Sequence, residues 1–234
     1  MERFAMRRWV YVFFMAIFFA CTSKDTKTQF EISGVVTNNS VQKIYLEEAQ
    51  AGGSGRTVVD SFVIGEDGQY RLKTKPREAM LYGIRLANHE VPSLFVINDA
   101  PKISVDIELN KQNAQLIDKY EVKQSPASTA MKNFISAFDN DLQKLYSIIR
   151  RANSLKSQNA PDSSILPLQK EWTIVAENIK DHGLTAINEA DNPALIVFEL
   201  GYFQGLNNDY GLEPLTLKQE FDILSKASNK FPDH

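Results

Sequence analysis

The spacing of apolar residues changes once along this chain, at Ser125-Pro126, and that change limits the possible folds. Between Phe30 and about Lys123, apolar and polar residues alternate with a period near two, and Gly, Pro, Asn and Asp interrupt the runs. Short runs of this kind at roughly 8–12-residue spacing are typical of antiparallel sandwiches and barrels. After Pro126 the apolar residues are spaced by three and four, which predicts helices. We therefore predict an α+β fold, in which an antiparallel β-sandwich is followed by an all-α helical segment.

The alternating region predicts about eight short strands separated by turns. They are expected at 30–36, 43–47, 57–64, 69–73, 78–86, 93–97, 102–109 and 119–123. Pro76, Pro92 and Pro101 fall between these runs, where a proline does not interrupt a hydrogen-bonded ladder.

The helical region begins with Ser125 as a predicted N-cap and Pro126 in the first turn. We expect 153–164 to form an exposed loop and a second helix to start after Pro167. The pair His182-Gly183 is expected to break or kink that helix. A buried helix over 194–203 and an amphipathic helix over 217–230 complete the prediction. The predicted organisation is a signal peptide (1–20), a tether (21–28), the β-sandwich domain (29–124) and the helical domain (125–234).

The N-terminus predicts export. Three arginines precede twelve uninterrupted apolar residues from Trp9 to Ala20, the pattern of a secretory signal. Twelve helical residues extend only about 18 Å, whereas a bilayer core is about 30 Å thick. The segment is therefore predicted to be a cleaved signal rather than a permanent membrane span.

The single cysteine follows that apolar run directly. The sequence Phe18-Phe19-Ala20-Cys21 resembles a bacterial lipobox, although Phe18 and Phe19 replace the more usual residues. The resemblance implies cleavage between Ala20 and Cys21, with lipidation of Cys21 holding the protein on the membrane; several acyl chains anchor durably. The alternative is an ordinary secretory signal with a coincidental cysteine. We expect a location in the cell envelope, on the periplasmic side of the inner or outer membrane.

Composition excludes several classes of function. One cysteine forms no internal disulfide, C-x-x-C pair or cysteine zinc cage. A formal net charge of −3 is too mild for a nucleic-acid binder. The histidines His89, His182 and His234 lack metal-ligand spacing, so we predict no metal and no cofactor.

The remaining candidate residues have structural interpretations. The segment 52–55 lacks the G-K-[ST] ending of a phosphate loop and is predicted to be a flexible hairpin tip, and Ser54 and Ser61 lack a nucleophile elbow. The acidic pairs Glu47-Glu48, Glu66-Asp67 and Asp139/Asp141 are expected to be solvated. Trp172, Tyr202 and Phe203 are predicted core residues. Glu199 is expected to extend to the rim of the core, with contact to a partner as the alternative. We therefore predict no catalytic residue.

The strand segments carry a family resemblance. The segments Phe30-Glu-Ile-Ser-Gly34, Lys43-Ile-Tyr-Leu46, Gly68-Gln-Tyr70 and Leu94-Phe-Val-Ile-Asn98, behind a lipoprotein-like signal, resemble domain of unknown function 4369. The resemblance implies a β-sandwich in a Bacteroidetes cell-envelope lipoprotein. In many such proteins it also implies a C-terminal thioredoxin-like domain with W-C-x-x-C, and no C-x-x-C occurs in this sequence.

Three functions remain open. The leading expectation is a lipid-anchored periplasmic binding or interaction module that is not an enzyme and contacts an envelope protein partner. The alternative is the N-terminal part of a truncated or split thioredoxin-like thiol–disulfide oxidoreductase. The third is a module that binds a glycan or small ligand through the sandwich loops.

Overall fold

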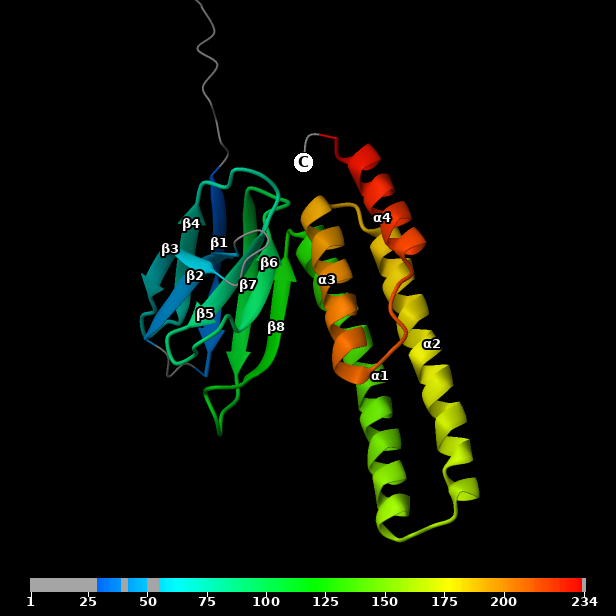
Figure 1. Ribbon diagram of the computed structural model, residues 1–234. Helices are drawn as coiled ribbons and strands as arrows, with labels where there is room; N and C mark the ends of the chain where they lie inside the picture. Colours follow the sequence, from blue (N-terminus) through cyan, green and yellow to red (C-terminus); the bar gives the residue numbers. More distant parts are fainter. Residues whose placement is uncertain (1–28, 39–41, 50–54, 233–234) are drawn as a thin grey trace, which may run out of the picture.

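A computed structural model describes residues 29–38, 42–49 and 55–232. The predicted signal peptide, the tether, Cys21, Ser54 and His234 lie outside the described residues. Two four-stranded sheets pack face to face and are followed by four helices (Figure 1), so the predicted α+β fold is confirmed.

Each predicted strand segment corresponds to a strand. The strands are β1 (Phe30–Thr37), β2 (Lys43–Ala49), β3 (Arg56–Val63), β4 (Gln69–Thr74), β5 (Leu81–Leu86), β6 (Leu94–Ile97), β7 (Lys102–Leu109) and β8 (Ile117–Lys123). One sheet has the order β4-β1-β7-β8 and the other β3-β2-β5-β6. Alternate side chains of both sheets, such as Ile32 and Leu72 facing Leu46 and Ile84, are fully buried between them. This burial explains the period of two, since one face of each sheet contacts the core.

One strand pair departs from the antiparallel expectation. β1 pairs with β4 in antiparallel register but with β7 in parallel register. Between β1 and β7 the chain forms β4 and all four strands of the second sheet, and β7 then runs in the same direction as β1. At this pairing a Cβ on Gly34 would lie 1.9 Å from the carbonyl oxygen of Val105, so only glycine fits there.

The helical segment contains four α-helices and one short 3₁₀ turn in the described residues. They are α1 (Pro126–Ser157), η1 (Asp162–Ser164), α2 (Leu166–Glu189), α3 (Pro193–Tyr210) and α4 (Leu217–Lys230). The predicted N-cap is confirmed, because the Ser125 hydroxyl accepts a hydrogen bond from the Ser128 amide at 3.1 Å. Asn192 caps α3 in the same way, and Thr216 with Gln219 forms a capping box on α4.

Two helix predictions are wrong. α1 continues to Ser157, which places 153–157 in a helix rather than in the expected loop. α2 passes through His182 and Gly183 without a break. Gly183 is buried where α2 crosses α3, and a Cβ there would lie 2.7 Å from Cδ2 of Phe203. The glycine therefore permits close helix contact instead of ending the helix.

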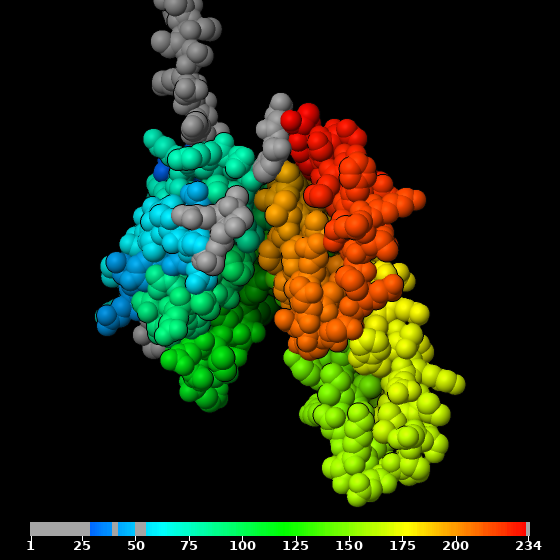
Figure 2. Space-filling model, in the orientation of Figure 1, coloured from blue at the N-terminus to red at the C-terminus, as the bar shows by residue number. Residues whose placement is uncertain are grey.

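The helices pack beside the sandwich. α1 and α2 form a long hairpin, and α3 packs along both of them (Figure 1). α4 packs against α2 and α3, with hydrogen bonds from Lys226 to Asn188 and from Gln204 to Glu220. Ile97 at the end of β6 belongs to the helical core, and Leu81 and Phe95 contact it as well. The far half of the α1–α2 hairpin projects away from the sandwich (Figure 2). Among the described residues, no helix is long and apolar enough to cross a membrane.

The crossing of α2 and α3 generates a stability prediction. Relative to the same substitution at an open helical position, Gly183→Ala is expected to lower the free energy of unfolding by about 1 kcal/mol or more, because the buried Phe203 ring must move to admit a methyl group. Gly201→Ala in α3 is the control, since nothing lies within 4 Å of its added Cβ. That variant should raise the free energy of unfolding by up to about 1 kcal/mol through helix propensity. Urea denaturation of both variants measures the difference, and equal effects would contradict the packing argument.

Candidate functional site

A pocket of about 860 Å³ opens between the first half of α1, the second half of α2 and the start of α3. Its α1 wall includes Ala127, Ala130 and Ala137, flanked by Phe134 and Phe138, and Pro126 and Asn133 complete it. The three alanines leave room where larger side chains would fill the gap between helices. The two phenylalanine rings lie 4.6 Å apart between centroids and both contact the Tyr202 ring edge-on. Apart from Asn133, the wall is thus apolar, and its aromatic part is held in the helical core.

The loop after β6 also reaches this pocket and attaches it to the sandwich. Asp99 lines the pocket and accepts hydrogen bonds from the Ala127 amide at 2.7 Å and from the Ser125 hydroxyl at 2.6 Å. The Ser128 hydroxyl accepts a bond from the Ile97 amide at 2.8 Å. A carboxylate at a helix N-terminus also interacts favourably with the helix dipole. The first turn of α1, and with it one end of the pocket, is therefore fixed to β6.

Glu199 lines the same pocket from α3 and is almost completely buried, with 2% of its surface exposed. Its Oε2 has no hydrogen-bond partner among the described residues. Burial raises the pKa of this carboxyl to about 7, because loss of water disfavours the charged form. The expected extension of Glu199 to the rim is wrong: its α3 position, four residues after Leu195 and four before Phe203, lies on the buried face.

The other charged groups of the pocket are mostly acidic. Asp99, Asp181, Glu189 and Asp191 line it together with Glu199, and no Lys or Arg is among the lining residues that the structure describes. Asp191 forms an ion pair with Lys230 at 2.8 Å, and this lysine also donates to the Ala190 carbonyl at 3.2 Å. His182 is the one lining histidine. The pocket thus combines an apolar wall with a strongly acidic set of side chains.

His182 lines the pocket beside a second buried acid. Its Nδ1 lies 2.9 Å from Oδ2 of Asp141, and the Lys144 ammonium lies 2.8 Å from Oδ1 of the same carboxylate. Only 3% of the Asp141 side chain is exposed, so the expectation that it is solvated is wrong. Asp141 lies three residues after Phe138 and four before Leu145, on the buried face of α1. The His182 ring is about half exposed and lies in the middle of α2 rather than in a loop.

The paired acids of the sandwich form no comparable site. Glu47 is buried on the same face of β2 as Tyr45, beside Arg85 of β5, and the expectation of solvation is wrong there as well. It accepts a hydrogen bond from Arg85 at 2.5 Å and lies 3.8 Å from Arg56. The Arg85 guanidinium lies over the Tyr45 ring, 4.2 Å from its centroid. Since both oxygens face arginines, this cluster is an internally paired structural element of the sheet.

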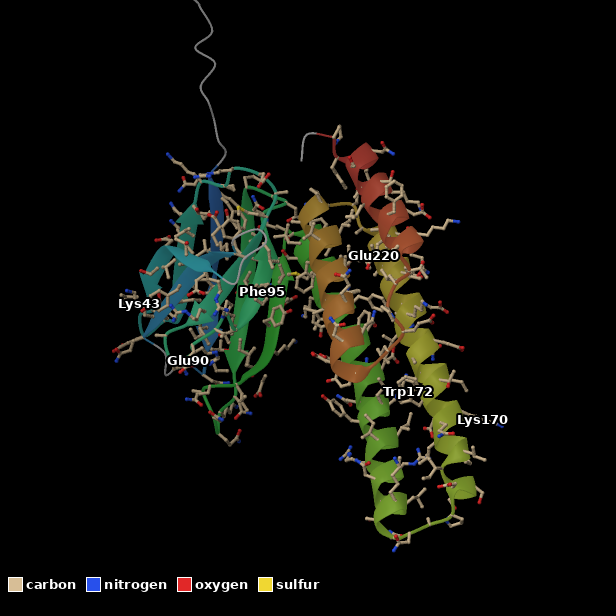
Figure 3. All side chains as sticks on the ribbon, viewed as in Figure 1. Lys43, Glu90, Phe95, Lys170, Trp172 and Glu220 are labelled. Carbon is tan, nitrogen blue, oxygen red and sulfur yellow. The ribbon has the colours of Figure 1, made fainter. Side chains whose placement is uncertain are left out.

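The remaining sequence candidates are dispersed. His89 lies in the β5–β6 connection, with its Nδ1 2.7 Å from the Ser93 hydroxyl, and Ser61 is exposed on β3. Glu66 and Asp67 lie in an exposed turn, as expected. The residues predicted as core, Trp172, Tyr202 and Phe203, do pack in the helical core, and Trp172 lies between α1 and α2 (Figure 3). In the described ranges no group of three or more His, Cys, Asp or Glu side chains is placed to hold a metal ion.

With the geometry known, comparison with known families identifies one part of the chain. Residues 30–131 match the family model for a domain of unknown function, DUF4369. The predicted resemblance is thereby confirmed for the sandwich. The DUF4369 range ends within α1, so it includes Asp99, Ser125 and Ser128 and therefore the attachment of α1 to β6. No curated protein matches this chain.

The buried carboxyl of Glu199 predicts a pH-dependent stability. Its pKa of about 7 in the folded chain lies above its usual value of 4.5, so the folded state keeps a proton that the unfolded chain has released. The free energy of unfolding should therefore fall as the pH rises from about 4.5 to 7, by roughly 3 kcal/mol in total. Glu199→Gln has no such proton and should lack this decrease.

Urea denaturation at pH values from 4.5 to 8 measures the effect. Glu189→Gln is the control, because it removes an exposed carboxylate from the same pocket and should leave the wild-type profile unchanged. Parallel profiles for the wild type and Glu199→Gln would show that Glu199 keeps no proton on folding.

Proposed function

We propose that this chain is a lipid-anchored cell-envelope protein that acts by binding rather than by catalysis, and that its ligand occupies the pocket between α1, α2 and α3. The observation that carries the proposal is the pocket itself. Its volume of about 860 Å³ lies in the usual range for small-molecule sites, which are mostly apolar with a few polar groups. The α1 wall with Ala130, Phe134 and Ala137 matches that description.

The rigidity of the surrounding helices supports binding in this pocket. The Asp99 carboxylate holds the start of α1, Gly183 and Phe203 bring α2 and α3 into close contact, and the side chain of Asn192 caps α3. These three interactions surround the pocket and are made before a ligand arrives. A pre-formed site avoids part of the ordering cost of association.

The N-terminal sequence supports the proposed location. An arginine-rich start, an apolar run to Ala20 and a cysteine at position 21 combine the features of a bacterial lipoprotein signal. Lipidation of Cys21 would place the sandwich and helices at the membrane surface, on the periplasmic side of the inner or outer membrane. The resemblance to Bacteroidetes envelope lipoproteins favours the same compartment, where an envelope protein partner would meet the module.

The match of residues 30–131 to DUF4369 favours a second candidate. Because this domain resembles one that precedes thioredoxin-like domains, the chain is alternatively the N-terminal part of a thiol–disulfide oxidoreductase. Exchange requires a thiolate that attacks a disulfide, so the chemistry would belong to a separate segment. Sequencing the DNA after the codon for His234 tests this: a frame that encodes W-C-x-x-C would favour the oxidoreductase, and unrelated sequence would remove it.

Membrane attachment is expected to depend on Cys21. Cells that express the wild-type chain should incorporate labelled palmitate into it and retain it in the membrane fraction, and Cys21→Ala should lose the label and the retention. Cys21→Ala removes the thiol that would be acylated and leaves every residue of the described fold unchanged. Ser23→Ala is the control, because it changes a neighbouring side chain and keeps the thiol. A Cys21→Ala chain that remains in the membrane fraction would overturn the anchor.

Ligand binding is expected to depend on the empty space beside α1. The probes are 4-phenylbutan-1-ol, 4-phenylbutyrate and 4-phenylbutylamine (the phenylbutyl probes), in which a phenyl ring is carried on a four-carbon chain that ends in an alcohol, a carboxylate or an amine. At least one should bind the full chain in lipid nanodiscs, measured by isothermal titration calorimetry against empty nanodiscs. Ala137→Trp should weaken that binding at least tenfold, because the indole fills part of the pocket.

The control for the filled pocket is Ser136→Trp, which adds the same side chain to an exposed neighbour on α1 outside the pocket lining. It should bind as the wild type does. Circular dichroism confirms that both variants keep their helices. Absence of binding by all three probes, or binding that survives Ala137→Trp, would overturn the proposed site.

A further inference from the structure

We propose that the pocket between α1, α2 and α3 selects a cationic amphiphile, that is, a ligand that joins a protonated amine to an apolar body. This inference rests on the proposed function, since it names the ligand class of the same pocket. It follows from the charges that line the pocket, from the buried Glu199, whose Oε2 has no partner among the described residues, and from the apolar wall on α1.

The charged side chains that line the pocket are predominantly acidic. Five carboxylates line the pocket, and none of the lining residues that the structure describes is a Lys or Arg. Two of the five are already engaged: Asp99 by the first turn of α1 and Asp191 by Lys230. Asp181, Glu189 and Glu199 form no hydrogen bond or ion pair through their carboxylates with the described part of the chain. Three carboxylates thus remain for a ligand, and an anionic ligand would meet them with no Lys or Arg among the described lining residues to offset their charge.

Among the unpaired carboxylates of the pocket, Glu199 has a distinct position. Asp181 and Glu189 are exposed and solvated, so they contribute to the potential of the pocket but need no partner. Glu199 differs, because 98% of its surface is buried and its Oε2 has no partner among the described residues. An unpaired buried carboxylate is unfavourable, and pairing with a cation relieves much of that cost. A ligand amine that reaches Glu199 supplies the positive charge that the described part of the chain does not place there.

The apolar wall of the pocket favours a hydrocarbon body for the rest of the ligand. Ala130, Ala137 and the Phe134 ring present hydrocarbon to the pocket, which favours an apolar body by burial of its surface. A bare metal ion or a small hydrophilic amine would leave this wall in contact with water. The combination of an apolar wall and a buried acid therefore fits a molecule that has both parts, such as an alkyl or aryl amine.

The test compares the three phenylbutyl probes on the full chain in nanodiscs at pH 7.4. 4-Phenylbutylamine should bind at least tenfold more tightly than 4-phenylbutan-1-ol, and 4-phenylbutyrate should bind most weakly. Glu199→Gln should lower the affinity for the amine about tenfold and change the affinity for the alcohol less than twofold. This split distinguishes loss of a charge partner from a general change in the shape of the pocket.

The matched control is Glu177→Gln, an exposed position on α2 outside the pocket lining. It removes the same charge from the chain and should leave all three affinities unchanged. Equal affinity for the three probes, a preference for the alcohol or the carboxylate, or equal loss in Glu177→Gln would overturn the selectivity while leaving a binding pocket in place. Loss of all binding would instead overturn the proposed function.

Discussion

The attachment of α1 to the end of β6 is the interaction on which the rest of the molecule depends. The Asp99 carboxylate accepts hydrogen bonds from the Ala127 amide and the Ser125 hydroxyl, while the Ser128 hydroxyl accepts one from the Ile97 amide. The bond from the Ala127 amide satisfies a donor that the helix N-terminus would otherwise leave unpaired, and the bond from the Ile97 amide ties the end of β6 to α1. They also fix the direction in which the long helix leaves the sandwich. Every later helix packs on α1 directly or through a neighbour. This short polar contact therefore positions the helices that line the pocket.

Much of the architecture was predictable because local chemistry and packing favour the same result. Alternation placed the strands, and Ser125-Pro126 marked the start of α1. Prediction was wrong at Gly183, where intrinsic propensity favours a helix end. The contact of this glycine with Phe203 involves two helices, and nothing in a single segment reveals it. The parallel pairing of β1 and β7 was missed for the same reason, since strand order depends on where the chain returns.

The buried acids explain why the candidate site was harder to predict than the fold. Glu199 and Asp141 occupy apolar-spaced positions on α3 and α1, and that spacing was a signal of burial available in the sequence. The general preference of carboxylates for water outweighed it. The partners of Asp141 come from two helices, whereas Glu199 has none for Oε2 among the described residues. Whether a buried charge has a partner depends on the tertiary structure. The sequence therefore indicated that Glu199 and Asp141 lie on buried helix faces, but not which of the two carboxylates is paired.

The parallel pairing of β1 with β7 has a consequence for the order of folding. β1 is an interior strand of its sheet, and its register with β7 joins residues such as Ile32 and Ile103. Pairings between such distant segments slow folding, because a long loop must close before the contact forms. In a chain that emerges N-terminus first, β1 has one ladder edge unpaired until β7 has followed it. The edge of β1 that pairs with β7 is therefore open to mispairing until β7 has joined the sheet.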